Sequence, residues 1–187
     1  EKLLPEKAIF HNCDIGNENK IGKILRNNKF DSVMHFAGLI RVDESVKKPE
    51  KYVEFNYNKA KLFLKICTNN NIKNFIFSSS ASVYGDAISD PMTENHPFNN
   101  KNFYGATKIC GEAMLKAFHH RYGLDYVGLR YMNVYGPRQD YQGAYIAVIM
   151  KMLDAIDKGD APTILGDGSE AFDFVSVTDC AQANICA

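Results

Sequence analysis

The sequence of 187 residues has no tryptophan, no net formal charge and no apolar run that approaches the length of a membrane span. Such a span needs roughly 18–20 consecutive apolar residues. The balanced charge gives no electrostatic argument for binding nucleic acid or an anionic membrane. The chain opens on Glu1, Lys2 and Leu3 without a visible secretory signal. We therefore expect a cytoplasmic protein whose partners include neither nucleic acid nor a membrane.

The placement of the five cysteines argues against two common uses. The five residues are Cys13, Cys67, Cys110, Cys180 and Cys186. No two of them form a CxxC pair, and no histidine stands at the spacing of a zinc ligand. An odd number of cysteines also argues against a disulfide framework. We expect free thiols in a reducing compartment and no metal site.

Apolar residues make up 45% of the chain, which is enough for one domain with a hydrophobic core. Short apolar runs alternate with segments of helical spacing, and this predicts a doubly wound α/β fold with helices on both faces of a parallel sheet. Ligands bind at the carboxyl ends of the strands in such folds. The expected strands are 8–15, 32–36, 74–78 and 126–131, and the expected helices are 19–28, 49–70 and 103–122.

The pattern changes after Pro137. Apolar spacing predicts a helix over 144–156 and strands over 162–165 and 172–177. A turn is expected between those strands, at Gly166-Asp167-Gly168.

The most informative residues are three serines after the third strand and a Tyr/Lys pair on the following helix. Tyr104 and Lys108 are four residues apart, so they share one helix face. Tyrosine titrates near ~10, too high for a base at neutral pH, but a nearby ammonium favours the phenolate. A hydroxyl from 78–80 could bond the same substrate oxygen. This outlines a Ser/Tyr/Lys site that removes a proton from an alcohol.

These residues belong to a set of motifs that resembles the extended short-chain dehydrogenase/reductase family and, within it, the nucleotide-sugar epimerases. The motifs follow the order of the family and span nearly the whole chain. They are Asp31–Gly38, Asn74–Gly85, Tyr104–Lys108, Leu129–Arg138, Gly166–Gly168, Asp173–Val175 and Val177–Asp179.

The resemblance implies an NAD-dependent nucleotide-sugar 4-epimerase with a Rossmann-like sheet. The catalytic residues that the resemblance implies are Ser80, Tyr104 and Lys108. The residues that it places at the substrate are Ser80, Tyr104, Asn133 and Arg138. The residues that it places at NAD are Asp14, Ile15, Phe36, Ala37, Gly38, Leu39, Asn56, Ser78, Tyr104, Lys108 and Tyr131.

Several of these residues have a structural alternative. Asp14 equally suits a turn at a strand end, and Asn133 equally suits a structural turn. Asn56 is expected to anchor backbone at the sheet end. Ser78 and Ser79 suit a strand-end turn, so the choice of Ser80 among the three serines rests on the resemblance.

The chain departs from the family's pattern at two places. Ile40 stands where relatives carry a lysine near the cofactor, and Phe172 stands where many carry an arginine for the substrate diphosphate. Dehydratases of the family need an Asp-Glu pair where this chain has Ala81 and Ser82, so a dehydratase is disfavoured.

The sequence leaves the exact reaction open. A UDP-glucuronate decarboxylase or another nucleotide-sugar epimerase of the same fold is the nearest competing interpretation, and glucose is not distinguished from N-acetylglucosamine. A non-catalytic dinucleotide-binding protein is the rival from another class. It would have no need of both Tyr104 and Lys108, and this chain has both.

The resemblance also bears on organisation. The glycine-rich turn of dinucleotide-binding proteins is absent, and Glu1 corresponds to a point after the family's second strand, so we expect an internal fragment of a longer protein. Residues 1–137 then form a partial NAD-binding domain missing its first strands. Residues 138–187 begin a small substrate lobe. The family leads us to expect a homodimer formed through 51–70 and 103–122.

Overall fold

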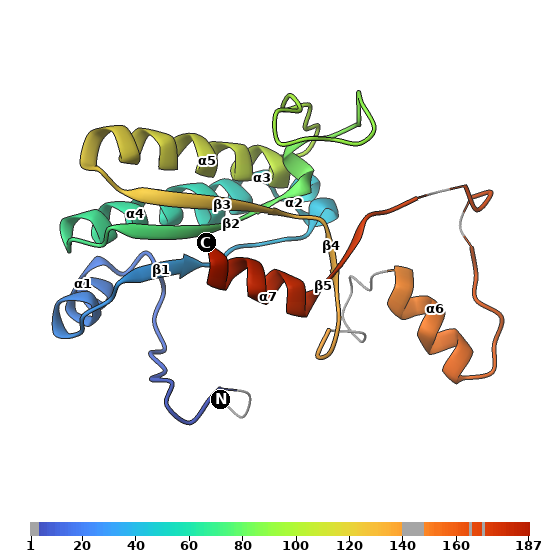
Figure 1. The fold of residues 1–187 in the computed structure, drawn as a ribbon, viewed down its shortest axis with the longest axis horizontal. Helices are drawn as coiled ribbons and strands as arrows, with labels where there is room; N and C mark the ends of the chain where they lie inside the picture. Colours follow the sequence, from blue (N-terminus) through green and yellow to red (C-terminus); the bar gives the residue numbers. More distant parts are fainter. Residues whose placement is uncertain (1–3, 140–147, 165, 170) are drawn as a thin grey trace. The chain divides into compact units, whose positions relative to one another are not determined.

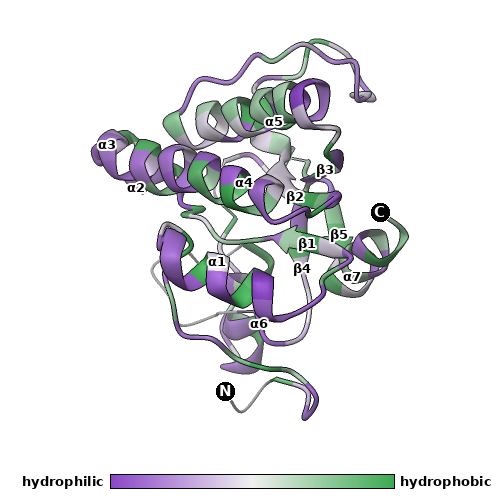
Figure 2. Ribbon diagram, turned by 90° about the vertical axis from the view of Figure 1, so that its left-hand side faces the viewer, coloured by the Kyte–Doolittle hydropathy of each residue, from purple (hydrophilic) through white to green (hydrophobic). Residues whose placement is uncertain are grey.

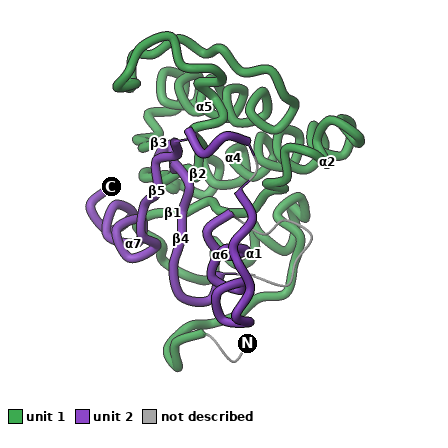
Figure 3. The backbone as a smooth tube through the Cα atoms, turned by 90° about the vertical axis from the view of Figure 1, so that its right-hand side faces the viewer, with its two compact units in different colours: residues 1–128 green, residues 129–187 purple. Residues whose placement is uncertain are grey.

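The computed structural model describes residues 4–139, 148–164, 166–169 and 171–187. Its ribbon is drawn in Figure 1, and its two compact units, residues 1–128 and 129–187, are coloured in Figure 3. The predicted functional division after Pro137 stays a prediction, because a compact unit need not coincide with a functional lobe.

A parallel sheet organises the first unit. Strand β2 (Asn74–Ser80) lies between β1 (Ser32–His35) and β3 (Asp125–Tyr131), whose first residues belong to this unit. β1 and β2 are parallel, with Ser32 opposite Asn74 and His35 opposite Phe77. Three successive residues of β2 from Phe75 are buried, as in a strand covered on both faces. The expected parallel α/β sheet is confirmed.

Two long helices cover one face of this sheet. Helix α5 (Phe103–Tyr122) lies against β2 and beside α4 (Lys59–Asn69) (Figure 1). Their apolar side chains enclose the core with those of β2. The buried members of this core are Leu64, Cys67, Ile72, Phe75, Phe77, Leu115, Phe118 and Leu124.

The segment before α4 is helical but not uniformly α-helical. It comprises α3 (Pro49–Tyr52), which has proline in its first turn, and a π-helical turn, η1 (Val53–Asn58). Together with α4 these elements form the long helix predicted over 49–70. Single π turns inside helices are rare and occur often at functional sites. Apolar spacing does not reveal the π turn.

Among the shorter elements of this unit, the helix predicted over 19–28 is present. Helix α1 (Glu18–Asn27) begins at Asn17, whose Oδ1 accepts a hydrogen bond of 3.0 Å from Lys20 N. Its ribbon alternates between hydrophilic and hydrophobic along its turns (Figure 2), as a helix with one apolar side does. Helix α2 (Val42–Lys47) and the 3₁₀ turn η2 (Ala81–Val83) complete the unit.

Two predicted strands are wrong. Residues 8–15 form no strand in the described chain, and neither do residues 162–164; Leu165 lies outside the described residues. Apolar runs become strands only where a neighbouring strand accepts and donates the ladder hydrogen bonds, and no described strand pairs with these segments. The short apolar run was the only signal in both cases.

The second unit contains a small parallel pair. Strand β4 (Asn133–Tyr135) pairs with β5 (Phe174–Ser176), so the strand expected over 172–177 is shorter than predicted. Val177 instead begins helix α7 (Val177–Cys186), where Ser176 Oγ accepts from Thr178 N at 3.2 Å. Helix α6 (Val148–Asp157) confirms the later part of the helix predicted over 144–156, whose first residues, 144–147, lie outside the described chain. Residues 166–168 bend as expected.

The structure also bears on the cysteines and on the possibility of a membrane span. All five cysteines are free thiols, and burial raises the pKa of Cys67 to about 12. None of the helices in the described part of the chain is long and apolar enough to cross a membrane.

Candidate active site

Tyr104 lies in the first turn of α5, and Lys108 follows one turn later. Both side chains are buried, with 8% and 5% of their surface exposed. Lys108 Nζ is 5.7 Å from the centroid of the Tyr104 ring. The helix begins at Asn102, whose Oδ1 accepts from Gly105 N at 2.8 Å. The predicted helix face thus brings the ammonium close to the phenol.

The buried ammonium of Lys108 is held at the carboxyl end of β2. Its Nζ donates to the carbonyl oxygen of Ser78 at 2.7 Å and lies 5.1 Å from the centroid of the Phe77 ring. Burial lowers the pKa of Lys108 to about 8, because an ammonium removed from water is destabilised. At neutral pH the lysine is therefore largely protonated, and it loses its proton as the pH rises past about 8.

His35 lies beside this ammonium without a polar role. Its ring is buried and stacks on Phe77, with centroids 5.9 Å apart. Burial and the charge of Lys108 lower the pKa of His35 to about 4, so the ring is neutral. The ring therefore serves the packing of the core.

The three serines at the end of β2 have different surroundings. Ser79 is 2% exposed, and its Oγ donates to Glu112 Oε1 on α5 at 2.6 Å. Ser80 points the other way, because side chains alternate along a strand. Its Oγ accepts from Ser82 N at 3.2 Å and caps η2. A hydroxyl that accepts there keeps its proton to donate elsewhere.

Removing each hydroxyl in turn separates these roles. Ser79→Ala is expected to lower the free energy of unfolding by about 1.5–3 kcal/mol, the usual value of a hydrogen bond to a charged group, and to leave kcat nearly unchanged. Ser80→Ala is expected to lower kcat by about 10²-fold through loss of a donor to the substrate oxygen. Urea unfolding and turnover, measured on both variants, check this. The opposite pattern would make Ser79 the reactive serine.

The loop after β1 runs alongside the Tyr104/Lys108 helix and is tied to it by Asn56. The Asn56 amide accepts from Leu39 N at 2.7 Å and donates to Leu39 O at 2.8 Å. Its Nδ2 also lies 3.2 Å from Thr107 Oγ1, which donates to Tyr104 O at 2.7 Å. The expected role of Asn56 as a backbone anchor agrees with these bonds, and the π turn η1 supplies the residue.

The same loop offers an open backbone. Phe36, Ala37 and Gly38 are exposed. A Cβ on Gly38 would lie 3.2 Å from Asn56 Oδ1 and 3.9 Å from Lys108 Nζ. Any side chain at this position would therefore occupy space beside the buried ammonium. The glycine leaves this space free for a ligand that approaches the backbone closely.

Asp14 lines a separate open cavity of about 650 Å³ between the start of α1 and the η1–α4 segment, and Ile15 follows it as a half-buried residue. Asp14 Oδ2 pairs with Lys59 Nζ at 2.6 Å, and its Oδ1 accepts from Gly16 N at 2.7 Å. These two hydrogen bonds lower the pKa of Asp14. The turn that the sequence offered as the alternative for Asp14 is present.

The remaining predicted residues belong to the second unit. Tyr131 OH is 2.5 Å from Asn184 Nδ2, and burial raises the pKa of Tyr131. Both Asn133 N and Asn133 Nδ2 donate to Asp173 O at 3.1 Å, and Asn133 begins strand β4, so it does not form the structural turn considered for it. Arg138 has a positive φ of 71°. The roles of these residues toward a ligand stay predictions.

Sequence reasoning missed three buried or partly buried side chains of the site: Ser45 and Thr107, which bond to Tyr104, and Glu112, which bonds to Ser79. Thr107 and Glu112 lie on α5, three residues after Tyr104 and four after Lys108, and this spacing was a usable signal. Ser45 is 59 positions from Tyr104, whose backbone N–H it accepts at 3.2 Å. No pattern in a single sequence links positions so far apart. Among the described residues, no three His, Cys, Asp or Glu side chains form a group that could hold a metal ion.

A parallel α/β sheet with a serine at a strand end and a Tyr/Lys pair on the neighbouring helix defines the class of Rossmann-like short-chain dehydrogenase/reductase proteins. Comparison with known proteins makes the assignment narrower. The chain belongs to the NAD dependent epimerase/dehydratase family, whose profile matches residues 1–187.

Individual relatives are nucleotide-sugar enzymes. The chain is 37% identical to a UDP-glucose 4-epimerase of Lactobacillus helveticus, covering 100% of this chain and 60% of that protein. It is 43% identical to the UDP-N-acetylglucosamine 4-epimerase from Methanobrevibacter ruminantium M1 solved with UDP-N-acetylmuramic acid (TM-score 0.87; 94% and 56% covered). It is 30% identical to the UDP-glucose 4-epimerase from Thermus thermophilus solved with NAD (TM-score 0.87; 98% and 61% covered). The chain thus spans about three fifths of the length of these relatives.

Proposed function

We propose that the protein containing this chain is an NAD-dependent nucleotide-sugar 4-epimerase. The observation that carries the proposal is the buried Tyr104/Lys108 pair at the carboxyl end of β2. Kinship with UDP-glucose and UDP-N-acetylglucosamine 4-epimerases supports the substrate class. Residues 1–137 serve as the partial NAD-binding domain, and residues 138–187 begin the substrate lobe.

The residues present fit the cofactor. The loop from Phe36 to Leu39, with its side-chain-free Gly38 beside Lys108, suits close approach of a ribose or phosphate to backbone. In this proposal NAD supplies the hydride acceptor and donor. The residues that hold it are Asp14, Ile15, Phe36, Ala37, Gly38, Leu39, Asn56, Ser78, Tyr104, Lys108 and Tyr131.

The chain's own residues transfer the proton and hold the sugar in position. Tyr104, as phenolate, takes the proton from the C4 hydroxyl and returns it when the hydroxyl is restored. Ser80 donates to the same oxygen. The ammonium of Lys108 favours the phenolate. Asn133 and Arg138 bind the nucleotide diphosphate, because an arginine can pair bidentately with phosphate.

Epimerisation is tested with the full-length protein, given UDP-galactose or UDP-N-acetylgalactosamine without added NAD. The expected result is appearance of the corresponding gluco isomer, and the faster substrate identifies the preferred sugar. Release of carbon dioxide from UDP-glucuronate, with no conversion of either galacto substrate, would overturn the proposal in favour of a decarboxylase. NAD bound without turnover of any of the three would point to a non-catalytic binding protein.

We also propose that the full-length protein works in the cytoplasm as a homodimer. The adjacent helices α4 and α5 offer two long ridges that a second copy could pack against as a four-helix bundle. Sedimentation equilibrium of the full-length protein would show twice the monomer mass; a monomer at micromolar concentration would contradict this.

A further inference from the structure

The backbone N–H of Tyr104 is bonded to a side chain from a different helix. The first N–H groups of a helix have no acceptor within it and need partners from elsewhere. In α5 the capping residue Asn102 serves Gly105 N at 2.8 Å, whereas Tyr104 N donates to Ser45 Oγ at 3.2 Å. Ser45 lies in α2, so the acceptor for Tyr104 comes from 59 positions earlier in the chain.

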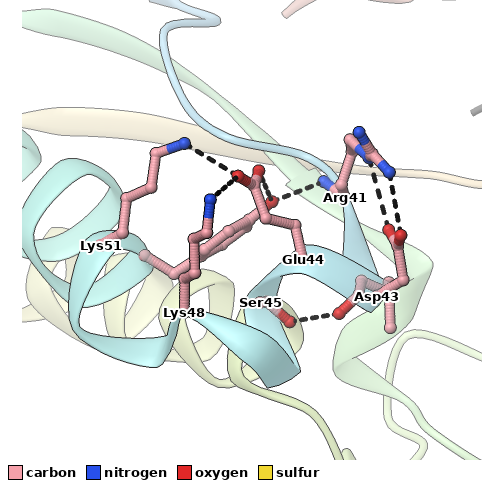
Figure 4. Close-up of polar contacts among 8 residues, drawn as sticks. Arg41, Asp43, Glu44, Ser45, Lys48 and Lys51 are labelled. Atoms are coloured by element: carbon pink, nitrogen blue, oxygen red, sulfur yellow. Dashed lines mark hydrogen bonds and ion pairs between the residues drawn. The ribbon is translucent and has the colours of Figure 1, made fainter. Parts of the chain in front are cut away.

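The hydroxyl of Ser45 has a fixed orientation. Ser45 is 0% exposed, so water does not compete for it. Its proton goes to Val42 O at 2.7 Å (Figure 4), which leaves an oxygen lone pair for Tyr104 N. On the other side of the same residue, Thr107 Oγ1 donates to Tyr104 O at 2.7 Å. Buried hydroxyl groups therefore hold both the N–H and the C=O of Tyr104.

Helix α2 is itself held firmly, although its six residues would not form a stable helix alone. Glu44, next to Ser45, pairs with Lys51 at 2.9 Å and with Lys48 at 3.7 Å (Figure 4). The hydroxyl of the fully buried Tyr52 donates to Glu44 Oε2 at 3.3 Å and accepts from Arg41 N at 3.0 Å. These contacts fix Ser45 relative to the loop that precedes α2.

We propose that Ser45 is a positioning residue for Tyr104. It sets where the first turn of α5 lies relative to the loop 36–41 and so places the phenol against the substrate oxygen. The inference deepens the proposed function and rests on it for its kinetic consequence. Its structural consequence, protection of the Tyr104 amide, is independent of any substrate.

The test compares three variants of the full-length protein with its bound cofactor: Ser45→Ala, which removes the acceptor, Ser45→Thr, which keeps a hydroxyl, and Ile66→Val, which trims the core away from the site. For Ser45→Ala we expect kcat to fall about tenfold, because small displacements of a reacting group cost rate steeply, with KM within twofold of wild type. Amide hydrogen exchange in residues 103–106 should accelerate at least tenfold. Ser45→Thr should restore both, and Ile66→Val should match wild type in both.

Two results would overturn the inference. One is wild-type kcat or unchanged exchange at Tyr104 in Ser45→Ala. The other is an equal loss of kcat in Ile66→Val, which would trace the effect to general destabilisation. Should the wild-type protein turn over none of the UDP-sugars, the proposed function fails, while the exchange measurement still decides whether Ser45 holds the first turn of α5.

Discussion

Tyr104→Phe is expected to lower turnover of the UDP-sugar by about 10²–10⁴-fold, the usual contribution of a general base. The substitution removes only the hydroxyl, so the buried ring still packs at the start of α5 beside Lys108. The amount of NAD that copurifies with the protein should therefore not change. Single-turnover rates and the NAD content of the purified protein measure the two effects.

Tyr126 provides the matched control. It lies on β3 against the hydrophobic core and has no proposed role in the site. Tyr126→Phe removes the same atom, so turnover is expected to stay within twofold of wild type. The assignment of Tyr104 as the base fails if Tyr104→Phe retains more than a tenth of wild-type turnover.

Lys108→Met is expected to lower turnover by at least about 10²-fold and to change how stability depends on pH. The lysine titrates at about 8 in the fold and at 10.5 when unperturbed. Between these values the unfolded state binds more protons than the folded state, so this group raises the free energy of unfolding as pH increases. The difference corresponds to about 3 kcal/mol at most. Wild type should gain this stability between pH 8 and 10.5 relative to Lys108→Met.

The measurement is urea unfolding of both proteins at several values of pH, because the difference between them isolates Lys108 from other titrating groups. Lys65, whose side chain is exposed on α4, provides the control. Lys65→Met removes an exposed ammonium and should leave turnover as in wild type. Parallel pH profiles for wild type and Lys108→Met would show that the ammonium is not destabilised by burial.

Local sequence signals predicted the elements that carry the site. The apolar run before Ser78 predicted β2, the helix expected over 103–122 coincides with α5, and the i, i+4 spacing brings Lys108 to Tyr104. The amide of Asn56 bonds to the backbone of Leu39, which agrees with the anchor role expected from the family resemblance.

Features that depend on distant partners could not be predicted in this way. Residues 8–15 have the composition of a strand, but whether they pair depends on a neighbouring strand. The bond from Tyr104 N to Ser45 joins two helices that no periodicity relates. The different surroundings of Ser79 and Ser80 follow from the strand's two faces, which a row of three identical residues does not distinguish.

The π turn keeps buried side chains pointing in one direction along the helical segment 49–69. Tyr52, Asn56, Ala60 and Leu64 are all buried and are spaced by four residues. In a regular α-helix three such steps overshoot whole turns by about 120°, so the first and last residues would face different directions. The wider turn at 53–58 absorbs this drift. The turn therefore accommodates one extra residue: with one residue deleted from it, the eleven steps left between Tyr52 and Leu64 would fit a regular α-helix to within about 20°, and both side chains would still point the same way.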